Sequence, residues 1–146
     1  MVGSDDNSAR QDDLISGAEL CYQAYVNKDR SLIERLIADD FHFTSPLDNR
    51  IDRKVYFERC WPNSATTADI RFVYLAQQDE RVFVTCEGRN TNGNAFRNTE
   101  ILTVQHGKLV DVEVYFGWTL PHAAATGGFT NAGEQTRGSV RGWTKP

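Results

Sequence analysis

Apolar residues recur at helical spacing in the first part of the chain. Between residues 12 and 27, Leu14, Ala18, Cys21 and Tyr25 form one stripe. Such a stripe is typical of a helix that buries one face against a core. Residues 1–11 precede the pattern and are polar, so we expect them to form a flexible, acidic N-terminus.

Two further helices are indicated by capping patterns. Ser31 with Glu34 three residues later has the form of a capping box and predicts a second helix. Asp52 is expected to cap a third helix, which Pro62 ends. A short strand over residues 41–45 lies between these two helices.

The rest of the chain has the alternating pattern of β-strands. Residues 70–76 and 81–89 alternate, and residues 95–118 read as two more strands joined by a tight turn. Helices followed by a long meander predict an α+β domain over residues 12–118. Residues 119–146 contain few large apolar residues and are expected to form a C-terminal arm, which drapes over the domain or a partner subunit.

Glu100 interrupts the apolar face of the last hairpin. A three-residue loop at 105–107 would place Glu100 opposite Val112 and on the same face as Asn98, whereas a two-residue loop would place it opposite Glu113. A carboxylate with apolar neighbours is paired, protonated or functional. The apolar residues expected on this face are Val110, Val112, Val114 and Phe116.

The preceding turn leaves two arrangements open. Asn92-Gly93 predicts a hairpin between residues 81–89 and 96–104. An even loop would bring Thr85, Glu87 and Arg89 to the face of Glu100, with Phe83. An odd loop would instead bring Val82, Val84, Cys86 and Gly88 to that face.

Composition and charge exclude several classes of function. The net charge of −4 and the absence of a basic run argue against a nucleic-acid partner. No apolar stretch has the length of a membrane span, and no signal peptide is recognisable, so we expect a cytoplasmic protein. Cys21, Cys60 and Cys86 lack metal-type spacing and are expected to be reduced. The three histidines have no partner at ligand spacing, and we expect neither a metal nor a cofactor.

The order of elements resembles a known superfamily. The segments AYVNKDRSLIERLIADDFHFTSP and FRNTEILTVQHGKLVDVEVYFGW, with the first helix, resemble the nuclear transport factor 2-like superfamily, close to its SnoaL-like branch. This resemblance implies a cone, in which three N-terminal helices pack on a strongly curved antiparallel sheet. The fold hosts many activities, so it does not define a reaction.

The resemblance has different consequences for three reaction types. Ketosteroid isomerases carry a general-base aspartate where this chain has Ser45, so the resemblance implies that this base is absent, and their first-helix tyrosine aligns with Cys21. SnoaL-like cyclases use a single acidic residue on the strand that holds Glu100. Limonene epoxide hydrolases use an Asp-Arg-Asp set, whose chemistry Glu100, Arg89 and Glu87 could imitate.

Two hypotheses about function follow. In the first, the cone holds an apolar molecule of polyketide, steroid or terpenoid type, and Glu100 transfers a proton as in an isomerase, cyclase or hydrolase. In the second, the protein is a dimeric small-molecule-binding or assembly module, and Glu100 is structural: it pairs with Arg89 or Arg97, or it bonds a helix end inside the cone. An enclosed cavity of about 300 Å³ or more beside Glu100 would favour the first hypothesis. A homodimer is expected through the outer sheet face around Ile101 and Tyr115.

The candidate site residues fall into two groups. The candidates for catalysis are Glu100, Tyr22, Tyr25 and Asn98. The expected lining of the pocket is Phe43, Ser45, Phe57, Trp61, Thr85, Glu87, Arg89, Phe96, Leu102, Val112, Val114 and Phe116.

Overall fold

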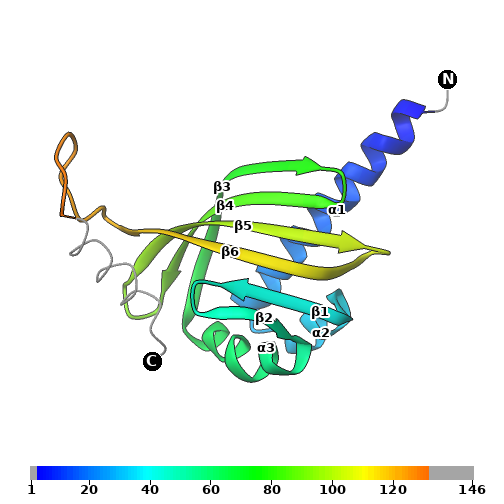
Figure 1. Ribbon diagram of the computed structural model, residues 1–146, viewed down its shortest axis with the longest axis horizontal. Coiled ribbons are helices and arrows are strands. Elements are labelled where there is room, and N and C mark those ends of the chain that lie inside the picture. Colours follow the sequence, from blue (N-terminus) through cyan, green and yellow to red (C-terminus); the bar gives the residue numbers. More distant parts are fainter. Residues whose placement is uncertain (1–2, 132–146) are drawn as a thin grey trace.

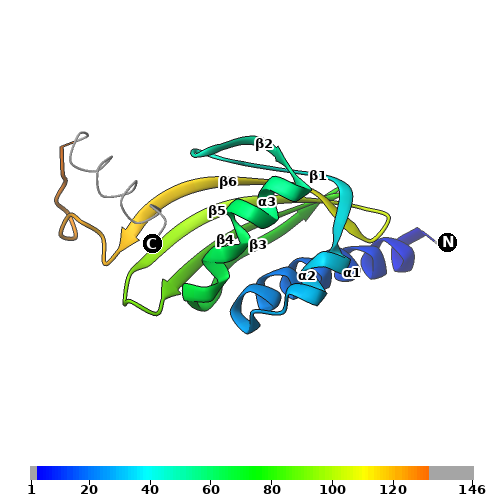
Figure 2. The same ribbon diagram turned by 90° about the horizontal axis from the view of Figure 1, so that it is seen from below.

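Three α-helices lie on the concave side of one curved sheet. The computed structural model describes residues 3–131, and their side chains from residue 13 onward. Figures 1 and 2 show helices covering one side of strongly bent strands. The expected α+β cone is confirmed. Its helices are α1 (Gly3–Asn27), α2 (Arg30–Leu36), α3 (Arg53–Arg59) and the 3₁₀-helix η1 (Trp61–Thr66).

The sheet contains six strands in the order β2-β1-β6-β5-β4-β3. Strands β1 and β6 are parallel, and all other neighbours are antiparallel. The strands are β1 (Ile37–Ser45), β2 (Asp48–Asp52), β3 (Thr67–Gln78), β4 (Arg81–Asn90), β5 (Ala95–Gln105) and β6 (Lys108–Leu120).

The core lies between α1 and the concave face of the sheet. Small side chains at Ala18, Cys21 and Ala24 are buried on α1 and allow the helix to approach the strands closely. The facing side chains of the sheet include Val82, Val84, Cys86, Leu102, Val112 and Val114. Helix α3 contacts β1 and β2, so it covers the edge of the same core.

The helix starts differ from the sequence-based expectations. Helix α1 begins at Gly3, within the segment expected to be a flexible terminus, because a helix can extend through polar residues that show no apolar periodicity. The cap of α2 is Asp29, whose side chain accepts a hydrogen bond from the Leu32 amide, so the Ser31 assignment was wrong. Asp52 caps α3 as expected and accepts from the Val55 amide.

The turn between β5 and β6 is shorter than predicted. Gln105 pairs with Lys108, and both His106 and Gly107 have positive φ, as a two-residue type I′ turn requires. A bulge at Val110 then inserts one residue in β6, so Glu100 lies opposite Val114. The expected partner Val112 was wrong, but this bulge keeps Glu100 on the inner face.

The turn between β4 and β5 has an odd number of residues between Arg89 and Ala95, which pair with each other. Cys86 and Val84 therefore share the inner face with Glu100. Strand β6 continues to Leu120, so the C-terminal arm leaves the sheet two residues later than expected, and it extends away from the strands in Figure 1. Its Phe129 is 89% exposed, and its remaining part, from residue 132, lies outside the described residues.

Candidate functional site

A cavity of about 190 Å³ lies inside the cone. Its walls come from α1, α3, η1 and the inner sheet face, and Leu47, half-exposed in the β1–β2 turn, also lines it. Most of this lining is apolar, including Phe43, Ile70, Leu102 and Val114. The volume is below the roughly 300 Å³ that would have favoured a catalytic pocket, so cavity size does not support that hypothesis, and the cavity suits only a compact molecule.

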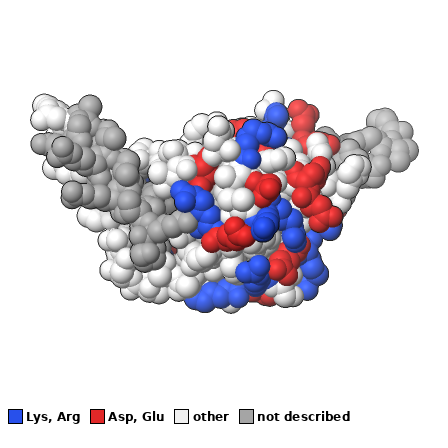
Figure 3. Space-filling view, turned by 60° about the horizontal axis from the view of Figure 1, so that its bottom comes forward, with Lys and Arg blue, Asp and Glu red and all other residues white. Residues whose placement is uncertain are grey.

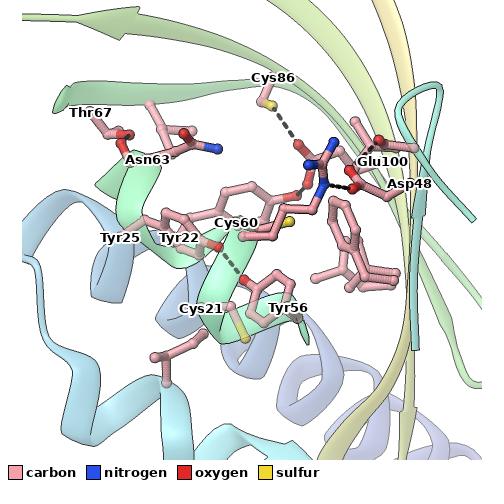
Figure 4. Close-up of a pocket in the computed structure, with 18 of the residues that line it drawn as sticks. Cys21, Tyr22, Tyr25, Asp48, Tyr56, Cys60, Asn63, Thr67, Cys86 and Glu100 are labelled. Carbon is pink, nitrogen blue, oxygen red and sulfur yellow. Dashed lines mark hydrogen bonds and ion pairs between the residues drawn. The ribbon is translucent and has the colours of Figure 1, made fainter. Parts of the chain in front are cut away.

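Glu100 and Tyr22 form a buried polar contact in the wall of the cavity. The Tyr22 hydroxyl, on α1, donates a hydrogen bond of 2.6 Å to Oε2 of Glu100 on β5. The Cys86 thiol on β4 lies 4.0 Å from the other carboxyl oxygen, Oε1. Figure 4 shows the three side chains converging from two strands and a helix. Within the described residues no ion pair joins Glu100 to a cation.

The apolar surroundings change the acidity of these groups. Burial raises the pKa of Glu100, and the hydrogen bond from Tyr22 opposes part of this rise. Burial and the nearby Glu100 charge also raise the pKa of Cys21 to about 12. The pKa of Tyr22 is raised for the same two reasons. Tyr22 therefore stays a neutral donor at physiological pH, whereas Glu100 can exchange a proton.

Tyr25 and Tyr56 form a second polar contact within the cavity. Their hydroxyl groups, from α1 and α3, are hydrogen-bonded to each other, as Figure 4 shows. Burial raises the pKa of both hydroxyls, so both remain neutral. In a pair of hydroxyls one donates to the other, which leaves one hydrogen available for a ligand oxygen.

A third polar group combines the β1–β2 turn with the end of α3. Asp48 forms an ion pair with Nε of Arg59 and accepts a 2.9 Å hydrogen bond from the Ser45 hydroxyl. We call Ser45, Asp48 and Arg59 the Arg59 cluster. Ser45 occupies the position of the general-base aspartate of ketosteroid isomerases, so no carboxylate is present at that position. Asp48 provides the second acidic side chain of the lining.

Most of the expected lining residues reach the cavity. Glu100, Tyr22 and Tyr25, proposed as catalytic, all line it. Seven of the expected lining residues do so as well: Phe43, Ser45, Phe96, Leu102, Val112, Val114 and Phe116.

Three expected lining residues lie on the outer face of the sheet instead. The odd β4–β5 loop turns Thr85, Glu87 and Arg89 away from Glu100. Glu87 pairs with Arg71 and Arg97 there, and hydrogen bonds from these arginines lower the pKa of Glu87. These positions rule out an epoxide-hydrolase-like set of Glu100, Arg89 and Glu87. They also rule out the expected ion pair of Glu100 with Arg89 or Arg97.

Three further residues lie next to the cavity but do not line it. Asn98 is on the inner face, yet it is only 1% exposed, and its Oδ1 accepts a 3.4 Å hydrogen bond from the Gly117 amide at a bulge in β6. Phe57 and Trp61 are buried in contact with each other. Phe57 also faces the guanidinium groups of Arg30 and Arg53, away from Glu100. Asn98 is thus a structural residue at a strand irregularity.

Sequence reasoning missed several lining residues. Asp48 escaped notice because the polar strand β2 has no apolar alternation that could reveal it, and Arg59 because its contact with Asp48 forms only in the folded chain. Cys86 belonged to the odd-loop alternative, which was left open. Tyr56 lies on the apolar side of its helix, and no pattern in the sequence distinguishes a core tyrosine from one that borders a cavity.

Other kinds of site find no support in the described part of the chain. Between residues 3 and 131 no group of three or more His, Cys, Asp or Glu side chains is arranged to hold a metal ion. The described helices are all too short or too polar to cross a membrane. Cys21, Cys60 and Cys86 are buried and free of disulfides. On the surface shown in Figure 3, acidic and basic side chains are intermixed.

Comparison with known proteins shows a likeness in structure alone. No family model matches the sequence, and no curated protein matches it significantly. An epoxide hydrolase of the LEH-like type from Mycobacterium tuberculosis is 14% identical, with a TM-score of 0.64 over 91% of this chain and 93% of its own. IdmH from Streptomyces antibioticus, provisionally assigned as a polyketide cyclase, is 19% identical, with a TM-score of 0.58 over 69% of this chain and 89% of its own.

A third similar structure has no assigned activity. This NTF2-like protein of unknown function from Cytophaga hutchinsonii is 13% identical, with a TM-score of 0.58 over 71% of this chain and 89% of its own. At such identities the likeness defines the fold and leaves the reaction open. The chain has the fold of the NTF2-like (nuclear transport factor 2-like) superfamily, as its sequence pattern indicated.

Proposed function

We propose that the protein binds a compact, mainly apolar molecule in the cone and that Glu100 transfers a proton to or from it. The observation that carries this proposal is the position of Glu100 in an apolar cavity, hydrogen-bonded to Tyr22 and, among the described residues, without an ion pair to a cation. A carboxyl group with a raised pKa in such a place is suited to general acid/base catalysis.

The arrangement favours an isomerase or a cyclase over a hydrolase. A hydrolase of the Asp-Arg-Asp type needs an arginine and a second carboxylate around a water, and Glu87 and Arg89 lie on the other side of the sheet. Proton transfer at a carbon next to a carbonyl needs one base and one hydrogen-bond donor. Glu100 is the base, and the Tyr25–Tyr56 pair is the neutral donor available to the carbonyl oxygen.

The proposed step is the formation of an enolate. The Glu100 carboxylate takes a proton from the carbon next to the carbonyl, and the electron pair of the broken C–H bond moves to the carbonyl oxygen. In an unsaturated ketone, return of the proton from Glu100 to the far carbon of the dienolate gives an isomer. In a diketone, attack of the enolate on the second carbonyl carbon closes a ring, and the resulting alkoxide takes the proton from Glu100. Neither outcome requires a cofactor. The small cavity favours terpenoid-sized substrates over steroids or extended polyketides.

The test measures hydrogen exchange in compact cyclic ketones. In D₂O, deuterium incorporation next to the carbonyl is followed by proton NMR with the wild type, Glu100→Gln and Glu113→Gln. Glu113→Gln removes the same charge from the outer face of the sheet. We expect the Glu100→Gln protein to lose a factor of about 10²–10⁴ in rate and the control to lose nothing.

The alternative is a binding module without catalysis. It predicts that the ketones bind equally well to the wild type and to Glu100→Gln, and that neither protein accelerates exchange. Full exchange activity in the Glu100→Gln protein would also rule out the proposed role of Glu100.

A further inference from the structure

The cavity contains a single positive charge. Among the described residues that line it, the charged ones are Asp48, Arg59 and Glu100, so Arg59 is the cation of this lining. Its side chain belongs to the last residue of α3, where Lys54 and Glu58 are exposed and pair with each other and Arg53 donates a hydrogen bond to the Glu34 carbonyl. Although Arg59 is partly exposed, its side chain also lines the mainly apolar cavity, where a ligand would meet it.

Asp48 holds the Arg59 side chain in this position. The Asp48 side chain is only 8% exposed, and both of its oxygens are occupied, one by Arg59 and the other by the Ser45 hydroxyl. The hydrogen bond to Asp48 raises the pKa of Arg59, so the guanidinium is charged throughout the range in which the protein folds. Asp48 therefore acts as a fixed support that orients Arg59.

The contact with Asp48 uses only part of the guanidinium group. The bond to Asp48 is made by Nε, and no other hydrogen bond or ion pair of Arg59 occurs among residues 13–131. Within this part of the chain, the two terminal nitrogens, Nη1 and Nη2, are not engaged by a carboxylate. They form a planar fork that matches the two oxygens of a carboxylate. The Arg59 side chain is 40% exposed, so a ligand can reach this fork.

We propose that Arg59 anchors a carboxylate of the ligand, while the apolar body of the ligand fills the cone toward Glu100. This inference rests on the proposed function, because it names the substrate class of the same cavity: a compact apolar acid. The lining beside the Arg59 cluster agrees with such a ligand. Phe43 and Leu47 lie on either side of Ser45 in the sequence and supply apolar surface for its body.

The charges that face Arg59 permit an anion to bind. Asp48 is the carboxylate in contact with it, and this contact engages Nε only. Glu100, the other acidic residue of the lining, has a raised pKa and so favours its neutral form more than an ordinary glutamate does. A ligand carboxylate bound by Nη1 and Nη2 is therefore repelled little, because the charge of Asp48 is balanced by Arg59 and Glu100 is ionised less readily than an ordinary glutamate.

The test compares three probes of nearly equal shape. Cyclohexanecarboxylate, cyclohexanecarboxamide and cyclohexylmethanol are titrated at pH 7.5 into ¹⁵N-labelled protein, and the Kd values and the Nε–H signal of Arg59 are followed by NMR. We expect the carboxylate to bind about tenfold more tightly than the neutral probes, as a charge-assisted bidentate contact provides. We also expect it to shift the Arg59 signal.

Variants on α3 identify the source of this preference. Arg59→Gln should bind all three probes with similar Kd values, whereas Lys54→Gln, which removes the same charge from the same helix, should keep the tenfold preference. Arg59→Gln leaves Asp48 without its counter-charge, so the double variant Asp48→Asn/Arg59→Gln provides a second protein in which the preference should be lost without a buried unpaired carboxylate.

The outcomes separate this inference from the proposed function. If all three probes bind the wild type equally, or if Arg59→Gln keeps the preference for the carboxylate, the anchor is overturned while the cavity and the role of Glu100 stand. If Glu100→Gln binds the carboxylate as the wild type does but fails to catalyse exchange, both proposals hold. If no probe binds the wild type at millimolar concentration, both proposals are wrong.

Discussion

The Tyr22 hydroxyl lies 2.6 Å from Oε2 of Glu100, although the two residues come from opposite walls of the cone. Tyr22 is on the helix that spans the concave face, and Glu100 is on a central strand of the sheet. Their hydrogen bond stabilises the ionised carboxyl group, whereas burial favours the protonated form. The balance of these two effects determines the pH range in which Glu100 can work as a base.

The buried carboxyl group should make the stability of the protein depend on pH. The pKa of Glu100 in the folded state is higher than that of an unfolded glutamate, about 4.3. Below both values the group is protonated in both states and carries no penalty. The penalty develops between the two values and is complete above the folded pKa, at about 1.4 kcal/mol for each unit of difference.

Glu100→Gln removes this titration. We therefore expect the free energy of unfolding of the variant, relative to the wild type, to increase as the pH rises from 4 to 8. Urea unfolding at several pH values measures the difference, with Glu113→Gln on the outer face as the control for a lost negative charge. A difference between Glu100→Gln and the wild type that is constant over this range would contradict the raised pKa.

Removing the Tyr22 hydroxyl should raise the pKa of Glu100 and make its ionised form less favourable. Tyr22→Phe removes the hydrogen bond that lowers the pKa of Glu100, so this pKa should rise further. At pH values where Glu100 is ionised, we expect a loss of about 1.5–3 kcal/mol in the free energy of unfolding, typical of a hydrogen bond to a charged group. The pKa is measured by a ¹³C NMR titration of the glutamate carboxyl carbons.

Tyr25→Phe is the matched control for this measurement. Tyr25 also lies on α1 and lines the cavity, but its hydroxyl is bonded to Tyr56 and not to Glu100. Its removal should change the pKa of Glu100 less than Tyr22→Phe does. An equal change in both variants would show that the cavity as a whole, and not the Tyr22 hydrogen bond, governs this pKa.

The position of Glu100 could be predicted from the sequence for a partly mistaken reason. The expected three-residue loop and the observed two-residue turn with a bulge at Val110 differ in their cross-strand pairs, yet both place Glu100 on the inner face. Side chains alternate with a period of two, so any two registers that differ by an even shift conserve the face. The apolar pattern around Glu100 was thus more informative than the turn.

The Arg59 cluster could not be predicted in the same way. Strand β2 consists of Asp48–Asp52, with one apolar residue in five, and its pairing with β1 is a tertiary choice. Only that pairing brings Asp48 next to Arg59, eleven positions along the chain. The expected position of Glu87 and Arg89 in the cavity lining was wrong for a related reason. One residue more or less in the 90–94 loop moves both side chains to the opposite face of the sheet.

A glycine in β6 should be essential for the bulge beside the cavity. A Cβ atom at Gly117 would lie 2.2 Å from the carbonyl oxygen of Arg97, a backbone atom that cannot move aside without distorting the strand. We expect Gly117→Ala to destabilise the protein by about 1–3 kcal/mol, as for overpacking of a rigid site.

Gly17→Ala is the control, because nothing lies within 4 Å of a Cβ atom at this position. Replacing a glycine by alanine in a helix interior should stabilise the folded protein by about 1 kcal/mol. Thermal unfolding of both variants measures the contrast, and equal effects would exclude the steric explanation.

The outer face of the sheet should join two copies of this chain. Tyr74 and Tyr115 lie on this face and are 66% and 55% exposed, and Trp118, further along β6, is also exposed. Aromatic side chains at this density are typical of interfaces, and a face of this kind can pair with itself about a two-fold axis. We expect a homodimer by size-exclusion chromatography with light scattering at micromolar concentration.

Tyr115→Lys should shift the protein to a monomer, because the substitution would bury a charge at the contact. Leu20→Lys, on the exposed side of α1, should leave the dimer intact. A wild type that is monomeric at this concentration would exclude the outer face as a stable interface.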